Sequence, residues 1–393
     1  MEWVDLYARA LEHARKGIAK NAMFAYNVNV DVVKHLTNET PPKQISRVLL
    51  TCVKEGKQRE IQTSKKTIKT LIKKLGFDEE RMGGQAGNMA NAASMLGVRS
   101  YVHVLLKDRK QMKLFEKPEN IFVARNCFKT ADRVSVSCEV PIHLVLEFKK
   151  GYRLGRFVAP SSNRLILSWN PRNSVMKIDE EFARCSKEII KKLNHVFISG
   201  FHNLTLKDRF KHRIEEVANQ LEEWRRINRK IKIHVELGNF QSSKILREVA
   251  SNILPLSSSV GFDEYELKQL KQALRINRNL LEACDELCER FNSIVFHSPS
   301  FSFDVGKPSQ EGLLFGSLLA AYKAATGRNA SFAELERFLK EAKVNRKGVK
   351  KYQEFKKTKF KNDASFAPAL LIPQPKITVG LGDCFSVGYF LLK

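Results

Sequence analysis

The sequence predicts an α/β protein with a large, mostly parallel sheet flanked by helices and a second, smaller β-sheet that acts as a lid. Three observations predict this fold. From residue 185 onward, short apolar strands alternate with helical segments, which is typical of parallel strands joined by crossover helices. Residues 130–170 instead carry alternating apolar segments without helices between them, which indicates an antiparallel patch. The length of 393 residues leaves room for one large domain and a smaller insert.

The first half of the chain is expected to contribute to both sheets. Its predicted elements, in order, are an amphipathic helix (1–17), an apolar strand-like run (21–36) with the polar residues Asn29 and Asp31, two strands within 45–64 around the turn KEGKQ, a basic helix (65–75) closed by Gly76, and a helix of small residues (90–96) between Gly83-Gly84-Gly87 and Gly97. Further strands are expected at RVSVSCEV (133–140) and IHLVLEF (142–148), before the turn KKGYR.

The second half is expected to build most of the large domain. Its helices are predicted at 185–193, 208–227, 242–251, 263–274, 279–291 and 311–327, and its strands at 195–200, 232–238 and 293–298. A lysine-rich connection over 340–366 precedes a final strand at 376–379. Residues 1–34, 76–125 and 171–393 are therefore assigned to the large domain, and residues 35–75 and 126–170 to the lid.

Composition narrows the class of protein. Lys and Arg exceed Asp and Glu by 26, which suits anionic partners or small anionic substrates and is also common as simple surface charge. Zinc-finger spacing and RNA-binding aromatic motifs are absent from the sequence, so we expect no nucleic acid as the main partner. No apolar run approaches the ~20 residues that span a bilayer. The seven cysteines are odd in number and follow no secretory signal, which predicts a reducing, cytoplasmic location.

The stretch KITVGLGDCFSVGYF, residues 376–390, carries the most specific chemistry. Gly380 and Gly382 allow the backbone to approach a ligand, and the free N–H groups of the helix that follows attract a phosphate. Asp383 at this turn could take a proton from a hydroxyl while the turn holds a transferring phosphoryl group. A tight turn with Asp383 as helix N-cap explains the same four residues equally well.

Taken together, nine motifs resemble one family, the archaeal ADP-dependent sugar kinases (glucokinase and phosphofructokinase) of the ribokinase-like superfamily. The resemblance runs from about Trp3 to Phe390. The motifs follow the family's order: AYNVNVD (25–31), GGQAGNMAN (83–91), IHLVLEFKKG (142–151), APSSNRLI (159–166), FISGFHNL (197–204), HVELG (234–238), GFDEYEL (261–267), VFHS (295–298) and TVGLGD (378–383). This order favours Asp383 as a catalytic base over a simple cap.

The resemblance implies a role for each matching residue. Asn29 and Asp31 would bind sugar hydroxyls, with Gly83, Gly84 and Gln85 lining the same pocket. Gly380, Gly382 and Asp383 would form the anion hole and base, and Arg164 would reach phosphate oxygens when the lid closes. Glu236 and Glu266 would organise Mg²⁺, partly through water, with helix-start carboxylates as the less favoured alternative. The nucleotide side would hold His297, Tyr322, Val379 and Gly380, with a core histidine and a core tyrosine as alternatives for the first two.

Two departures from the family pattern and one lid residue bear on the substrate. Asp263 stands where the family's NxxE motif has Asn, and the segment APSSNRLI has serines where the family usually shows Arg-Glu. A lid carboxylate accompanies glucose in this family, because it accepts sugar hydroxyls and repels a substrate phosphate. Glu60 falls near that position, which favours glucose slightly over fructose 6-phosphate, whereas the lysine surplus and Arg164 suit a phosphorylated sugar.

The resemblance therefore predicts an ADP-dependent sugar kinase that uses Mg²⁺, binds ADP and a sugar or sugar phosphate, and acts as a monomer. Two other functions fit the same residues. One is a non-catalytic sugar or nucleotide sensor on a kinase scaffold, and the other is an ATP-dependent kinase of the same superfamily.

Overall fold

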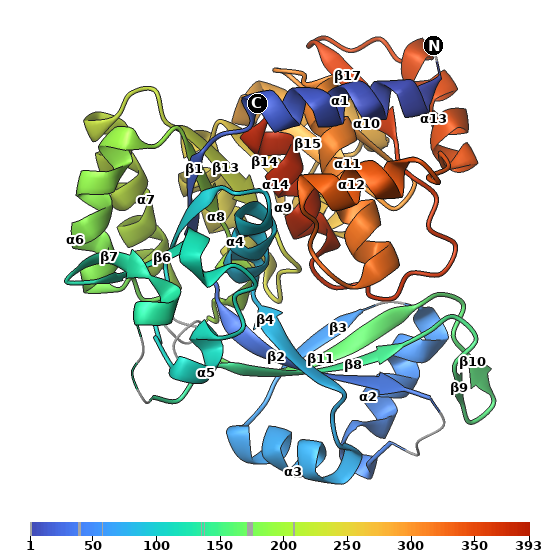
Figure 1. Cartoon of the computed structure of the whole chain (residues 1–393). Helices are drawn as coiled ribbons and strands as arrows, with labels where there is room; N and C mark the ends of the chain where they lie inside the picture. Colours follow the sequence, from blue (N-terminus) through green and yellow to red (C-terminus); the bar gives the residue numbers. More distant parts are fainter. Residues whose placement is uncertain are drawn as a thin grey trace.

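The computed structural model describes residues 2–37, 41–56, 58–134, 136, 138–170, 176–206 and 209–393, and two sheets organise them (Figure 1). The larger sheet has ten strands in the order β17-β16-β15-β14-β13-β12-β1-β5-β6-β7. Its strands are β1 (Asn21–Ala25), β5 (Arg99–Val102), β6 (Ile121–Arg125), β7 (Cys127–Thr130), β12 (His195–Ile198), β13 (Lys232–Glu236), β14 (Ser259–Phe262), β15 (Ile294–His297), β16 (Phe301–Val305) and β17 (Ala364–Pro368). Strands β15 to β6 run parallel, and β16, β17 and β7 are antiparallel to their neighbours.

The ten-stranded sheet is buried on both faces. Successive residues of β1 point to opposite sides, so that Met23 and Ala25 join one apolar core and Ala22 and Phe24 join the other. The first core includes α6 (Glu180–Ile189), α7 (Phe210–Ile227), α8 (Ser243–Asn252), α9 (Glu264–Leu274) and α10 (Leu280–Phe291). The second includes α1 (Trp3–Gly17), α4 (Gln85–Met95), α11 (Gln310–Thr326), α12 (Phe332–Leu339) and α14 (Leu381–Leu391). The predicted α/β fold with a mostly parallel sheet is confirmed.

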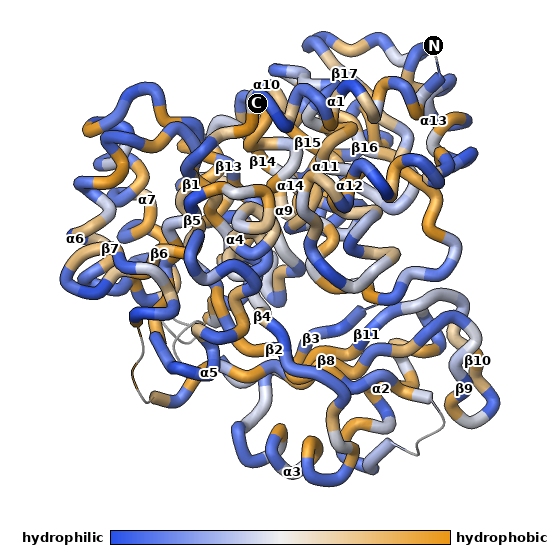
Figure 2. The backbone as a smooth tube through the Cα atoms, in the orientation of Figure 1, coloured by the Kyte–Doolittle hydropathy of each residue, from blue (hydrophilic) through white to orange (hydrophobic). Residues whose placement is uncertain are grey.

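The smaller sheet has five strands in the order β3-β11-β8-β2-β4 and lies below the larger one in Figure 1. Its strands are β2 (Asn29–Leu36), β3 (Arg59–Gln62), β4 (Glu79–Gly83), β8 (Ile142–Phe148) and β11 (Asn163–Trp169). One face packs its apolar side chains against α2 (Lys43–Glu55) and α3 (Lys65–Leu75). In α3 hydrophilic and hydrophobic segments alternate, as Figure 2 shows, and Ile68 and Leu71 face this core.

The sheet pairing refines the expected domain limits. Strand β2 was expected in the large domain up to residue 34, and β4 in the large segment 76–125, yet both pair within the five-stranded sheet. The division into five segments remains a proposal, and the pairing favours assigning these two strands to the lid. A short hairpin of β9 (Arg153–Leu154) and β10 (Phe157–Val158) extends from the same part.

Several predicted elements differ from the structure. Residues 43–55 form α2 rather than a strand, because Ile45, Leu49, Cys52 and Val53 recur at helical spacing and all are buried. The strand predicted at 133–140 is absent from the described residues of that segment, where Val136 forms only an isolated β-bridge with Asp108. The lysine-rich connection contains α13 (Arg346–Lys357). The short helix α5 (Arg109–Met112) was not predicted. None of the helices in the described part of the chain has the length and apolar character needed to cross a bilayer.

Candidate active site

The start of α14 is a glycine-capped helix N-terminus. Gly380 is the N-cap and adopts a left-handed conformation with a φ of 71°, which favours glycine. The expected strand before it is absent. The Lys376 N–H donates to the carbonyl of Ala324, and the Thr378 carbonyl accepts from a side chain, so neither joins a ladder. Asp383 lies two residues inside the helix and is not its N-cap residue.

Asp383 is buried, with 7% of its surface exposed. Its Oδ2 accepts a hydrogen bond of 3.0 Å from Nδ2 of Asn88. Burial raises the pKa of Asp383 to about 7, the negative charge of Glu236 adds to the rise, and Lys323 partly offsets it. A carboxyl with this pKa exchanges a proton readily near neutral pH, as a general base requires.

The second face of the five-stranded sheet is polar although much of it is buried. Strand alternation and register place these residues on it, opposite the face that packs on α2 and α3: Asp31 and His35 of β2, Arg81 of β4, His143 and Glu147 of β8, Arg164 and Ser168 of β11, and Glu60 and Gln62 of β3. Burying such a face is costly unless its groups find partners. Four side chains of this face, those of Asp31, His143, Glu147 and Ser168, are almost fully buried.

Asn29 and Asp31 begin the polar network on this face. Nδ2 of Asn29 donates to Oδ1 of Asp31 at 2.7 Å, and Nδ1 of His143 lies 3.7 Å from the same oxygen. Nε2 of His143 contacts Nδ2 of Asn170 at 2.6 Å. Buried polar atoms without a hydrogen-bond partner among the described residues include Asn29 Oδ1 and Asn170 Oδ1 of this network and Ser168 Oγ of the same sheet face. Unused buried acceptors and donors of this kind suit a polyhydroxylated ligand.

Glycines 83 and 84 allow this network to approach α4. A Cβ atom on Gly83 would lie 2.1 Å from Oδ1 of Asp31, and one on Gly84 would lie 2.4 Å from the carbonyl oxygen of Asn27. Gly84 is the N-cap of α4, which begins at Gln85 and not at residue 90 as predicted. Neither glycine therefore has room for a side chain, and their role in lining a sugar pocket stays a prediction.

Helix α4 connects the network with Asp383. At its first residue, Gln85 accepts a hydrogen bond of 3.2 Å from the N–H of Gly200 and donates one to the Leu237 carbonyl at 2.5 Å. One turn later, Asn88 donates to Asp383. The residues predicted for sugar binding and for proton transfer are thus joined through a single helical turn.

Glu60 faces the same network from β3. Its side chain is half-buried, and its charge acts on both Asp31 and His202. Burial raises the pKa of Asp31 and Glu60 adds to that rise, whereas His143 and Arg81 lower it. The structure therefore places two carboxylates, those of Glu60 and Asp31, beside the polar network.

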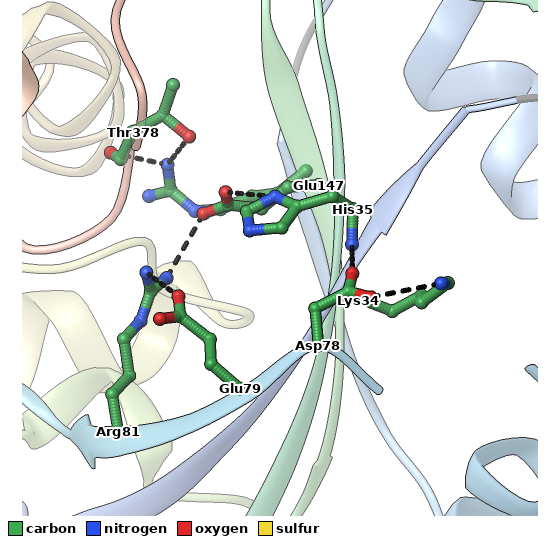
Figure 3. Close-up of polar contacts among 8 residues, drawn as sticks. Lys34, His35, Asp78, Glu79, Arg81, Glu147 and Thr378 are labelled. Atoms are coloured by element: carbon green, nitrogen blue, oxygen red, sulfur yellow. Dashed lines mark hydrogen bonds and ion pairs between the residues drawn. The ribbon is translucent and has the colours of Figure 1, made fainter. Parts of the chain in front are cut away.

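The side chain of Arg164 in β11 extends away from the five-stranded sheet and contacts the segment before the glycine turn. Its Nη1 donates to the Thr378 carbonyl at 2.8 Å and to the Thr378 Oγ1 at 3.1 Å. Across the sheet it stands opposite Glu147, which is buried and accepts from Arg81 Nη2 at 3.1 Å and lies 3.4 Å from His35 Nδ1 (Figure 3). Arg164 thus ties the five-stranded sheet to the segment directly before Gly380.

Glu236 lies at the carboxyl end of β13 and has three side-chain partners. Its oxygens contact His234 Nε2 at 3.1 Å, His297 Nε2 at 2.9 Å and Ser386 Oγ at 2.6 Å. Burial alone would raise the pKa of Glu236, but the two histidines outweigh it and hold the pKa at about 2. His297 therefore lies beneath the glycine turn, where a Cβ on Gly382 would come within 2.8 Å of its Cε1.

The second expected magnesium residue, Glu266, closes a capping box at the start of α9. Its Oε2 accepts from the Asp263 N–H at 2.9 Å, and Asp263 accepts from the N–H groups of Tyr265 and Glu266. Burial raises the pKa of Glu266, and the charges of Asp263, Glu236 and Asp383 raise it further. The described residues form no group of three or more side chains that could hold a metal directly. Clustered carboxylates without a direct ligand set fit a hydrated Mg²⁺ held through water.

Two predicted nucleotide residues lie apart from these contacts. Tyr322 is buried in the core beside α14, and its hydroxyl donates to Glu334 Oε1 at 3.2 Å. Val379 is half-buried directly before Gly380. Their nucleotide roles stay predictions.

Sequence reasoning missed three residues of this site: Asn88, His143 and Lys323. A signal existed for two of them, because Asn88 interrupts a run of small residues and Lys323 is the one charged side chain in the apolar stretch LLFGSLLAAYKAAT. His143 lies in an alternating strand and carries no comparable signal.

Comparison with known proteins agrees with this geometry. The conserved region of the ADP-specific phosphofructokinase/glucokinase family matches residues 20–392. The ADP-dependent glucose/glucosamine kinase of Pyrococcus furiosus is 29% identical, covering 99% of this chain and 98% of its own length. The ADP-specific phosphofructokinase of Methanosarcina acetivorans is 25% identical, covering 99% and 96%.

Among solved structures, an ADP-dependent kinase in complex with fructose 6-phosphate and ADPβS superposes with a TM-score of 0.88 at 24% identity, covering 100% of this chain and 97% of that one. This likeness confirms the expected α/β fold with a large sheet and a smaller one. The chain belongs to the ADP-specific phosphofructokinase/glucokinase family and is an ADP-dependent sugar kinase.

Proposed function

We propose that this protein transfers the β-phosphoryl group of ADP to a hydroxyl of a sugar, with Asp383 as the general base. One observation carries the proposal: a buried carboxyl with a pKa near 7 stands in the first turn of a glycine-capped helix and is linked through Asn88 to the helix that begins beside Asp31. Helix N-termini bind phosphate, and the carboxamide of Asn29 and the carboxylate of Asp31 at the start of β2 can bind hydroxyls.

In the proposed reaction, Asp383 accepts the proton of the sugar hydroxyl. The hydroxyl oxygen attacks the β-phosphorus, the bond from that phosphorus to the oxygen bridging the two phosphates breaks, and AMP leaves with that oxygen. The N–H groups at the start of α14 hold the phosphoryl oxygens, and Asn29 and Asp31 hold the acceptor. Arg164, which donates a hydrogen bond to the Thr378 carbonyl, would help to hold the lid over the site and to exclude water that would otherwise hydrolyse ADP.

Mg²⁺ would be held through water near Glu266 and Glu236, where it would neutralise phosphate charge. The hydrogen bonds of Glu236 to two histidines and a serine suit an outer position better than a direct ligand. Asp263, which stands where the family motif has Asn, adds one more carboxylate beside Glu266 and Glu236.

For the acceptor, we propose an uncharged sugar such as glucose in preference to fructose 6-phosphate. The polar network carries two carboxylates, Asp31 and Glu60, which accept hydroxyl hydrogen bonds and repel a substrate phosphate. The two cations of the same sheet face have other partners, Arg164 at Thr378 and Arg81 at Glu147. The relative from Pyrococcus furiosus, a glucose/glucosamine kinase, supports this choice, while the solved complex with fructose 6-phosphate supports the alternative.

The test is a panel of donors and acceptors with the full-length chain and Mg²⁺. ADP and ATP are each combined with glucose, glucosamine and fructose 6-phosphate, and the release of AMP or ADP is followed. AMP release that requires ADP and glucose is the expected result. Product formed only from ATP would identify an ATP-dependent kinase instead. Stabilisation by sugar in a thermal shift without any nucleotide turnover would identify a sensor.

A further inference from the structure

Lys323 of α11 is buried beside the start of α14, with 6% of its surface exposed. Its Nζ lies 3.2 Å from the point that a Cβ atom on Gly380 would occupy, and Nδ2 of Asn88 lies 3.1 Å from that same point. The ammonium group and the amide that binds Asp383 therefore flank Gly380 together. Helices α11 and α14 pack against each other in the second core, which fixes this lysine in place (Figure 1).

A second buried lysine, Lys107, forms ion pairs with carboxylates and serves as a comparison for Lys323. Lys107, 8% exposed, donates to Asp179 at 3.1 Å and to Glu181 at 2.9 Å. In the part of the chain that the structure describes, no carboxylate lies within 4.0 Å of the Lys323 ammonium, whose neighbours are the Cys384 thiol and, farther away, Asp383. Because a buried cation without an ionic partner costs several kcal/mol, its retention calls for a partner that arrives from outside.

The position of Lys323 indicates that its partner is an anion. The N-terminus of α14 carries the positive end of the helix dipole and free N–H groups, so a cation there meets charge of its own sign. A lysine adds to such a site only when an anion with several negative charges occupies it. The glycine cap leaves room on the backbone side for that anion to approach.

We propose that Lys323 binds the phosphoryl group that is transferred, so that its ammonium and the first N–H groups of α14 neutralise the β-phosphate of the donor together. This rests on the proposed function and adds to it a catalytic residue outside the glycine turn. Lys323 would donate hydrogen bonds to the phosphate oxygens, and the proton of the acceptor goes to Asp383.

The test compares ADP with AMP, which differ by the phosphate in question. Binding of each nucleotide to the full-length chain is measured by calorimetry for wild type, Lys323→Met, Lys323→Arg and Lys107→Met. Lys323→Met should weaken ADP binding ~10- to 100-fold and change AMP binding less than ~3-fold, in keeping with the loss of one charged hydrogen bond. Lys323→Arg should retain part of the ADP affinity. Lys107→Met removes a buried lysine elsewhere and should leave the ratio of ADP to AMP affinity unchanged.

An equal loss for ADP and AMP, or unchanged ADP binding, would overturn the proposal. If Lys323 only balanced the charge of Asp383, Lys323→Met would shift the pH profile of the remaining activity without changing the ADP to AMP ratio. A crystal structure of the wild type with ADPβS decides the matter even if the variants do not fold. Nζ should then lie within hydrogen-bond distance of a β-phosphate oxygen, and a position outside that range refutes the role.

These measurements also separate the two proposals. A failed donor panel together with Lys323-dependent discrimination of ADP from AMP would refute sugar phosphorylation and leave the phosphate site standing. If the protein phosphorylates the sugar from ADP but distinguishes ADP from AMP equally well without Lys323, the phosphate-binding role of Lys323 is refuted and the sugar kinase function stands.

Discussion

Two neighbouring regions of the site are built by different means. The acceptor cluster, formed by Asn29, Asp31, Glu60 and His143, lies on a sheet face and depends on side chains that bond one another. The helix-start cluster, formed by Gly380, Asp383, Asn88 and Lys323, depends on one backbone turn and on buried charge. Side chains on a sheet can change singly, whereas a capped helix end with buried charges tolerates little change. The acceptor cluster should therefore set which sugar is used, and the helix-start cluster should set whether transfer occurs.

Asp383→Asn is the sharpest way to test this division and should have the largest effect. Removing the general base should lower kcat by about 10² to 10⁴. Glucose affinity should change little, because the acceptor cluster is intact. Steady-state kinetics and calorimetry measure the two quantities. A turnover near that of the wild type would refute the role of Asp383.

The same substitution should stabilise the protein at alkaline pH. The pKa of Asp383 is about 7 in the folded chain and near 3.9 when unfolded, so the folded state loses stability as the pH rises between those values. Asparagine removes this loss. The free energy of unfolding of Asp383→Asn should exceed that of the wild type by about 1–3 kcal/mol at pH 8 and by much less at pH 4, as measured with urea.

Asp31→Ala tests the other cluster and should have the second largest effect. Loss of a buried carboxylate that accepts sugar hydroxyls should lower kcat/KM for glucose about 100-fold, mainly through KM. The Kd of ADP should be unchanged. Asp78→Ala is the matched control, because Asp78 bonds Lys34 and the His35 N–H at the outer edge of the same sheet and should not affect the sugar. Equal losses in both variants would argue against a specific role for Asp31.

The pH dependence tests the helix-start cluster without a substitution. Since burial raises the pKa of Asp383 to about 7, the base is protonated below this pH. The value of kcat/KM should fall about tenfold per pH unit below pH 7 and level off above it. A profile that is flat from pH 5 to pH 9 would contradict the assignment.

Glu60→Gln should have the smallest effect, on selectivity more than on rate. Removal of this charge should lower kcat/KM for glucose ~10-fold or less and raise the value for fructose 6-phosphate, because repulsion of the substrate phosphate decreases. Competition between the two sugars measures the ratio. An unchanged ratio would place the discrimination elsewhere in the acceptor cluster.

Much of the architecture could be predicted because its signals are local. The βα alternation after residue 185 predicted β12, β13 and β15 of the large sheet, and Gly76 and Gly380 lie at helix boundaries. The segment 45–55 was assigned to the wrong class because its apolar residues were read as a strand, although their spacing is helical. Strands β16 and β17 went unpredicted, since edge pairing depends on neighbours far apart in the chain.

The site divides in the same way. Motifs singled out Asp31, Gly83 and Asp383 as candidates, because glycine turns and carboxylates within apolar segments are visible in the sequence. The partners of these residues could not be predicted. Asn88 meets Asp383 across 295 positions, and Arg164 meets Thr378 across 214, so only the folded chain brings them together.

The five-stranded sheet is assembled from two separate stretches of chain, one that carries β2, β3 and β4 and one that carries β8 and β11. The backbone therefore crosses between the two parts of the molecule several times, at residues 26–28, near Gly84, and on either side of 142–169. Such a lid is joined to the rest of the molecule by several chain connections instead of one. A single protease cut within the lid should leave the two resulting fragments associated. No single continuous segment of the chain contains the lid alone, so the lid could not be expressed as one excised peptide.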